Sequence, residues 1–273
     1  DVGATIEGRR TATGNVIVEI DAQLDNRGMI FSATGSGQAP ITLLIKKAGA
    51  DHLNSGSIIA STNLTISGFN SFDNSGTIET SVANNQQLLI QGQSQATSTL
   101  TNSGTLTSGS GNLHIENFDI ITNTGDININ GGYFSTFDDD IRNFNTLNNS
   151  GNLNVAATFW LLINGGTINN TSATIGGTGN LHLESLVLDI TGALAINPNL
   201  TLDNVDVHGT GALTTNAVTF MIDGNALPSR IDTPLTNNGT FYVRGIDNQF
   251  NHSSVVNTGT LTIQVQSDTV PGV

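Results

Sequence analysis

The chain of 273 residues carries 22 Asp and Glu residues against eight Lys and Arg residues, which gives a formal net charge of −14. This acidic balance argues against binding to nucleic acid or to anionic lipid, because both need basic patches. The chain has no cysteine and no apolar stretch of membrane-spanning length, so we expect neither a disulfide framework nor insertion into a membrane.

A short phrase returns along the chain: Asn, a polar or small residue, Gly, a polar residue and then an apolar residue. Neighbouring copies lie roughly 20 to 28 residues apart, which is the period of a coiling β-solenoid. The clear copies are Asn54–Ile58, Asn74–Ile78, Asn102–Leu106, Asn123–Ile127, Asn149–Leu153, Asn237–Phe241 and Asn257–Leu261, and weaker copies lie at Asn26–Ile30 and Asn164–Ile168.

Each copy predicts a tight turn that leads into a strand, because Asn and Gly are turn residues and the following residues alternate between apolar and polar. One such strand cannot bury its apolar side alone, but stacked coils share a continuous core. The pattern therefore predicts an all-β fold, a single-stranded right-handed parallel β-helix (β-solenoid) of roughly 10 to 13 coils that spans residues 1–273 as one domain. Asn-Gly turns that join antiparallel hairpins in a β-sandwich are the alternative.

In a solenoid, equivalent side chains of successive coils stack. The turn Asn residues could form a hydrogen-bonded ladder, and the apolar residue of each phrase should point inward. The inward set predicted in this way is Ile78, Leu106, Ile127, Leu153 and Leu261.

A second repeat supports the same architecture. Gly111–Glu116 and Gly179–Glu184 share the pattern Gly-Asn-Leu-His, an aliphatic residue and Glu. Because His114 and His182 alternate with apolar neighbours, each should face outward, and several coils should separate them. We interpret them as solvated strand histidines rather than as metal ligands.

Residues 131–146 interrupt the repeat and gather aromatic and acidic side chains, which predicts a lateral loop on the solenoid. Asp138, Asp139 and Asp140 are the candidate metal ligands, with Ca²⁺ as the candidate ion and no other cofactor expected, because hard cations prefer several oxygen ligands. Tyr133 and Phe137 are the candidate ligand-binding residues, which would present aromatic faces to a sugar. In the alternative interpretation, the Phe residues cover the edge of the core and the Asp residues face water.

Few other residues suggest chemistry. Asp206 and His208 share a strand face, but nothing in the sequence marks a cleft around them, and Trp160 is interpreted as core or loop packing. Glycoside-cleaving sites need carboxylates that converge on one groove. The sequence alone assembles no such pair, so we expect no enzymatic activity.

The segments Leu100–Leu106 and Ile163–Asn170 resemble the repeats of filamentous-haemagglutinin-like exoproteins, and Leu44–Gly49 resembles the start of repeats in autotransporter passenger domains. The resemblance covers most of the chain as a general repeat pattern rather than as a specific motif. It implies a secreted or surface-exposed bacterial β-helix used in adhesion or display, without catalytic residues in the rod.

The sequence and the resemblance together predict a non-enzymatic, extracellular or cell-surface rod with a structural or adhesive role. The alternative is a glycan-processing β-helix, such as a polysaccharide lyase or a tailspike-like depolymerase. The expected partners are further copies of the chain in end-to-end association, or flanking parts of a longer chain, with surface glycans or host and cell surfaces as candidate ligands.

Overall fold

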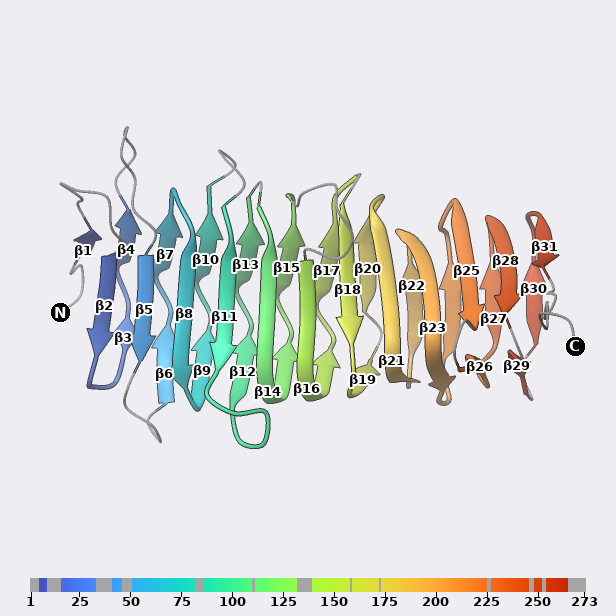
Figure 1. The fold of residues 1–273 in the computed structure, drawn as a ribbon, viewed down its shortest axis with the longest axis horizontal. Coiled ribbons are helices and arrows are strands. Elements are labelled where there is room, and N and C mark those ends of the chain that lie inside the picture. Colours follow the sequence, from blue (N-terminus) through green and yellow to red (C-terminus); the bar gives the residue numbers. More distant parts are fainter. Residues whose placement is uncertain are drawn as a thin grey trace, which may run out of the picture.

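Thirty-one parallel-paired strands and no helix make up the part of the chain that the computed structural model describes. The structure describes residues 5–8, 16–32, 41–45, 51–81, 86–109, 111–131, 139–157, 159–171, 173–224, 227–245, 248–251 and 254–264. The strands stack coil upon coil along the long axis of a rod (Figure 1). This confirms the predicted all-β parallel solenoid, while its right-handed sense stays a prediction.

One side of the rod is a 12-stranded parallel sheet with short strands. Its strands, in sheet order, are β1 (Thr5–Gly8), β4 (Met29–Ser32), β7 (Ser57–Ala60), β10 (Thr77–Thr80), β13 (Thr105–Ser108), β15 (Asp126–Ile129), β17 (Asn152–Val155), β20 (Thr174–Gly177), β22 (Ala193–Ile196), β24 (Ala212–Thr215), β27 (Leu235–Asn237) and β30 (Val255–Asn257). Its strand number falls within the predicted range of roughly 10 to 13 coils.

The remaining 19 strands form a second sheet that bends in the middle of each coil. They are β2 (Val16–Ile20), β3 (Asp25–Asn26), β5 (Ile41–Ile45), β6 (Asp51–Asn54), β8 (Leu64–Phe69), β9 (Ser71–Asn74), β11 (Leu88–Gly92), β12 (Thr99–Asn102), β14 (Leu113–Asn123), β16 (Asp139–Asn149), β18 (Trp160–Asn164), β19 (Thr167–Asn170), β21 (Asn180–Ile190), β23 (Asn199–His208), β25 (Thr219–Gly224), β26 (Arg230–Ile231), β28 (Thr240–Gly245), β29 (Gln249–Phe250) and β31 (Leu261–Gln264).

The bend divides this sheet into two faces, and we call the part before the bend in each coil the pre-bend face. In β14, for example, Leu113 pairs with β11 before the bend, whereas Ile120 pairs with β12 after it. Four non-glycine residues with positive φ form such bends, namely Asn117, Asn143, Ser185 and Asn204. Asn and Ser tolerate this conformation better than bulky or β-branched residues do.

The Asn residues of the repeated phrase form a buried ladder along one corner of the rod. Each Asn Nδ2 donates to the Oδ1 of the next coil's Asn at 2.6–3.2 Å, through Asn26, Asn54, Asn74, Asn102, Asn123, Asn149 and Asn170. The ladder ends where Ile190 takes the position that follows Asn170. This confirms the predicted stacking for the first two thirds of the chain.

Glycine is required at this corner because successive coils approach closely there. A Cβ atom on Gly104 would lie 2.0 Å from the Gly76 carbonyl oxygen, which no side chain tolerates. Neither glycine has a positive φ, so the close packing of backbones, rather than an unusual backbone torsion, explains why Gly recurs at this turn.

The last two strong copies of the phrase occupy a different corner. Asn237 ends β27 of the 12-stranded sheet and Gly239 leads into β28, whereas Asn149 ends β16 and leads into the 12-stranded sheet. Consequently Ile78, Leu106, Ile127 and Leu153 are buried in the 12-stranded sheet as predicted. Leu261 follows Phe241 on the core side of the other sheet, so its predicted place in the coil is wrong although its side chain lies on the core side.

Aliphatic columns fill the interior, together with buried phenylalanines. Phe69 packs against Phe72 and Phe118 with ring centroids 5.1 and 5.7 Å away, and Phe220 stacks on Phe241 at 4.7 Å. Burying each such side chain contributes about 1.5–3 kcal/mol.

Within the described residues there is no helix long and apolar enough to cross a membrane.

Candidate functional site

In the described part of the predicted metal site, Asp139 lies on the core side of its strand and Asp140 on the outward side, and both are buried. Residues 139–146 of the expected lateral loop belong to β16, which pairs in register with β14. Asp138, Tyr133 and Phe137 fall outside the described residues. Asp139 and Asp140 are 1% and 4% exposed, so the expectation that these carboxylates face water is wrong.

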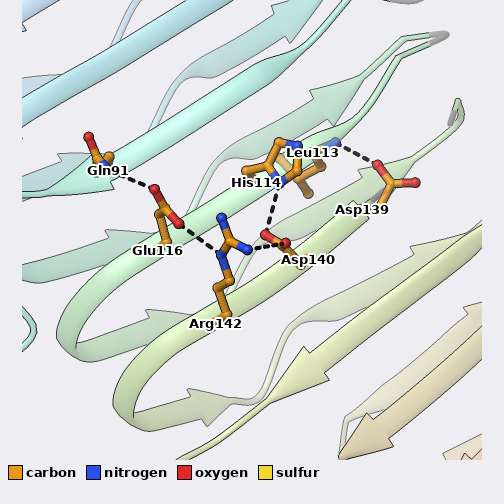
Figure 2. Close-up of polar contacts among 7 residues, drawn as sticks. All are labelled: Gln91, Leu113, His114, Glu116, Asp139, Asp140 and Arg142. Atoms are coloured by element: carbon orange, nitrogen blue, oxygen red, sulfur yellow. Dashed lines mark hydrogen bonds and ion pairs between the residues drawn. The ribbon is translucent and has the colours of Figure 1, made fainter. Parts of the chain in front are cut away.

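Both buried carboxylates are held by protein donors. The Asp139 carboxylate accepts the Leu113 backbone N–H at 2.5 Å (Figure 2). Asp140 Oδ1 lies 2.9 Å from His114 Nδ1, and Asp140 Oδ2 lies 3.4 Å from Arg142 Nη1. Charge-assisted contacts of this kind offset the desolvation of a buried carboxylate.

The same network extends along the rod axis to the two preceding coils. Arg142 Nε donates to Glu116 Oε2 at 2.9 Å, and Gln91 Nε2 donates to Glu116 Oε1 at 2.6 Å (Figure 2). The hydrogen bond to Glu116 raises the pKa of Arg142. No group of three or more His, Asp or Glu side chains arranged to hold a metal ion occurs among the described residues. Ca²⁺ binding by Asp138, Asp139 and Asp140 stays a prediction.

This network lies on the pre-bend face, where strand alternation sends every second side chain outward. Two outward columns therefore run along the rod, one residue per coil. The first passes through Leu89, His114, Asp140, Leu162, His182, Thr201, Met221 and Tyr242. The second passes through Gln91, Glu116, Arg142, Asn164, Glu184, Asp203, Asp223 and Arg244.

Further along the same columns the surface is hollowed into a groove of about 390 Å³. We call it the Trp160 groove, and its lining residues are Trp160, His182, Glu184, Thr201, Asp203, Met221, Asp223 and Arg244. The residues come from β18, β21, β23, β25 and β28, so the groove crosses five neighbouring strands. At about 4.8 Å between strands, it follows the rod axis for roughly 19 Å.

Trp160 stands at one end of the groove and is 41% exposed. It begins β18 and pairs with Asn180, so the interpretation as core packing is wrong, whereas packing against a loop stays a prediction. An exposed indole beside polar groups is typical of a binding surface, because it offers a large rigid apolar area with one N–H donor.

Three carboxylates converge on the groove floor, on successive coils. Glu184 pairs in register with Asp203, and the pairing of Leu202 with Ile222 places Asp223 one coil further. Asp223 forms an ion pair with Arg244, while Glu184 Oε2 accepts the Asn164 amide at 3.0 Å. Asp223 is 4% exposed, and its Oδ1 atom has no hydrogen-bond partner within the described chain.

Burial and crowding shift the protonation of two groove residues. Burial, followed by the neighbouring Asp223 charge, raises the pKa of Asp203 above its ordinary value. Burial lowers the pKa of His182 in spite of the nearby carboxylates, so its imidazole is neutral at pH 7. The hydrogen bond to Asp223 raises the pKa of Arg244, which stays charged.

The sequence pointed to His182 and Trp160 separately, but it did not bring the carboxylates together with each other or with Arg244. Their signal is spacing: Glu184, Asp203, Asp223 and Arg244 follow one another at 19, 20 and 21 residues, which is one coil each time. Asp206 and His208 do share an outward face, as predicted, but His208 Nδ1 lies 3.6 Å from Asp189 of the preceding coil.

Comparisons with known proteins add no identification. No protein-family model, no curated protein and no solved structure matches this chain. The resemblance to haemagglutinin-like exoproteins and autotransporter passengers therefore stays a prediction beyond the shared β-solenoid architecture.

Proposed function

We propose that this protein is an extracellular, adhesive β-solenoid rod that binds glycan chains along its side, in the Trp160 groove. The observation that carries the proposal is an exposed tryptophan at the end of an elongated groove whose floor is lined by carboxylates. The proposed extracellular location is supported by the sequence resemblance and by a low content of charged residues, 11% of the chain.

The groove offers the two kinds of contact that a sugar needs. The apolar face of a pyranose ring packs on an indole, and its hydroxyl groups donate to carboxylate oxygens. The groove runs along the rod axis through five strands, so it suits a chain of sugars better than a compact ligand. A rod with lateral binding is suited to adhesion, because neighbouring rods on a surface bind multivalently.

The experiment is a titration of the protein with neutral and charged oligosaccharides, compared with Trp160→Ala. The matched control is Val218→Ala, which truncates an apolar side chain that is 79% exposed and lies outside the groove. We expect Trp160→Ala to weaken binding by about tenfold or more and the control to leave it unchanged. Equal binding by both variants, or no binding of any oligosaccharide, would refute the proposal.

Cleavage of the bound glycan is a second candidate function, favoured by the carboxylates. Glycoside hydrolysis pairs a carboxylic acid of raised pKa with a second carboxylate, and the raised pKa of Asp203 beside Asp223 fits this pairing. The test is release of new reducing ends from a bound oligosaccharide. Release that Asp203→Asn abolishes would support cleavage, whereas intact oligosaccharide after long incubation would leave binding as the function.

End-to-end association is proposed as the way rods extend. Leu261 and Ile263 follow Phe241 and Val243 on the core side of the sheet, and they are 51% and 66% exposed at the last described coil. Stacking a further coil there would bury both side chains and pair open strand edges. Electron microscopy at high protein concentration should show filaments with a repeat near the rod length, and isolated rods would refute the proposal.

A further inference from the structure

The Trp160 groove carries more negative charge than its own residues neutralise. Three carboxylates line it, whereas the single cationic side chain is Arg244, which is engaged with Asp223. His182 contributes no charge at pH 7, because burial lowers its pKa. Asp203 therefore shares with Asp223 the attraction of Arg244, and Glu184 forms no ion pair with a cation of the described part of the chain.

The hydrogen bonds of these carboxylates also favour a cationic ligand. Glu184 accepts only the neutral amide of Asn164 among its recorded contacts. Asp203 accepts no hydrogen bond within the described residues, and burial, followed by the charge of Asp223, opposes its ionised form. Asp223 Oδ1 is a further buried acceptor that no described donor reaches. Unfilled acceptors on a half-buried floor favour a ligand that brings donors and positive charge.

Trp160 adds the other element of a cation site. It is 41% exposed at one end of the groove, in the coil before Glu184 and four residues along β18 from Asn164, which pairs with Glu184. The ring quadrupole attracts an ammonium group, and the attraction strengthens where water is excluded. An indole next to carboxylates is therefore a better site for an amine than for a carboxylate or sulfate.

From these observations we infer that the Trp160 groove selects glycans that carry free amino groups, that is, chains of unacetylated amino sugars. This inference rests on the proposed glycan binding and names its ligand class. Glu184, Asp203 and Asp223 stand on successive coils about 4.8 Å apart, so they present acceptors at a regular interval to a chain lying along the rod. Acidic sugars are excluded by repulsion from the same carboxylates.

The test is calorimetric titration at pH 6 with four probes: a glucosamine tetrasaccharide, an N-acetylglucosamine tetrasaccharide, a galacturonic acid tetrasaccharide and spermine. We expect the glucosamine tetrasaccharide to bind at least about tenfold more tightly than its acetylated counterpart, because charge-assisted hydrogen bonds are lost on acetylation. Its affinity should fall as salt is raised from 50 to 500 mM, since salt screens exposed charge pairs.

The four probes distinguish selectivity for amino groups from glycan binding in general. Equal binding of acetylated and free amino sugars would overturn the amine selectivity and keep glycan binding. Failure of all three saccharides would overturn both. Spermine binding as tightly as the amino sugar would show a general cation site, and would overturn the assignment to a glycan.

A pair of isosteric variants provides the control for net charge. Asp203→Asn should cost about tenfold in affinity for the glucosamine tetrasaccharide and clearly less for the acetylated probe, which loses only a hydroxyl contact and no ion pair. Asp73→Asn removes the same charge from an exposed position on the post-bend strand β9 and should change neither affinity. Folding is not at risk, because burial already disfavours the ionised form of Asp203. Equal effects of the two variants would refute a local role for Asp203.

Discussion

Asn102 is predicted to stabilise the rod by about 3 kcal/mol through its side chain alone. It is fully buried, accepts from Asn74 Nδ2 at 2.8 Å, and donates to Asn123 Oδ1 at 2.8 Å and to the Asp126 carbonyl at 3.1 Å. Asn102→Ala removes all three hydrogen bonds, each with a net contribution of about 1 kcal/mol. It also leaves the Asn123 oxygen buried without its donor, which adds to the loss.

The free energy of unfolding should be measured by chemical denaturation of the wild type and of two variants. The matched control is Asn152→Ala, which belongs to a later copy of the same phrase. Its side chain is exposed and makes a single hydrogen bond, to Asp126 Oδ1 at 2.8 Å. We expect the control to change the free energy of unfolding by no more than about 0.5 kcal/mol.

A double-mutant cycle distinguishes the ladder from general burial. Asn102→Ala and Asn123→Ala share a hydrogen bond, so their effects should be non-additive by about 1 kcal/mol. Asn26→Ala, several coils away, should add to Asn102→Ala without coupling. Equal losses for Asn102→Ala and Asn152→Ala, or strict additivity for the adjacent pair, would refute the ladder as a source of stability.

Three further predictions test the coil and the groove. Leu106→Asp places a charge in a dry core and should cost several kcal/mol, and an unchanged unfolding temperature would contradict its inward position. Gly104→Ala should cost about 1–3 kcal/mol in denaturation, because its Cβ meets the Gly76 carbonyl, whereas Gly176→Ala meets only the flexible end of a side chain and should cost less. Because burial lowers the pKa of His182, the imidazole is protonated at a higher pH in the unfolded chain than in the folded chain. The wild type should therefore lose more thermal stability than His182→Gln between pH 7 and pH 5. Equal losses for the two proteins would contradict the lowered pKa.

The solenoid could be predicted from sequence because its repeated turn has a direct physical cause. Wherever two coils meet at a tight corner, a Cβ would collide with the backbone of the coil below, so Gly recurs. The Asn beside it fills hydrogen bonds to the neighbouring coils, so it recurs too. A phrase of this kind reports the existence and period of the coils reliably.

The same phrase does not report which corner it occupies. Gly239 follows Asn237 at the opposite corner from Gly104, yet its Cβ would lie 1.9 Å from the Ala217 carbonyl oxygen, so the requirement for Gly is the same. The prediction for Leu261 is wrong for this reason, because the phrase was assumed to mark one place in every coil. Distinguishing the corners needs the register of the intervening coils, which the phrase does not contain.

The groove was missed because its residues become neighbours only through that register. The ladder Asn residues are 20 to 28 residues apart, since loops of different length interrupt the coils. A fixed period therefore fails to align the columns over the whole chain. Between Glu184 and Arg244 the coils are nearly regular, so a search for polar residues repeated at 19 to 21 residues would have found this column.

The two halves of the pre-bend face differ in how many of their carboxylates are paired with cations. Near β14 and β16, Arg142 contacts both Glu116 and Asp140, while His114 contacts Asp140 as well, so the acidic groups already have partners (Figure 2). Further along the same columns, Arg244 engages Asp223 and no second cation of the described chain reaches Glu184 or Asp203. The strand geometry is the same in both places. The two places differ in the number of cationic side chains, and the second is where we propose that a ligand supplies positive charge.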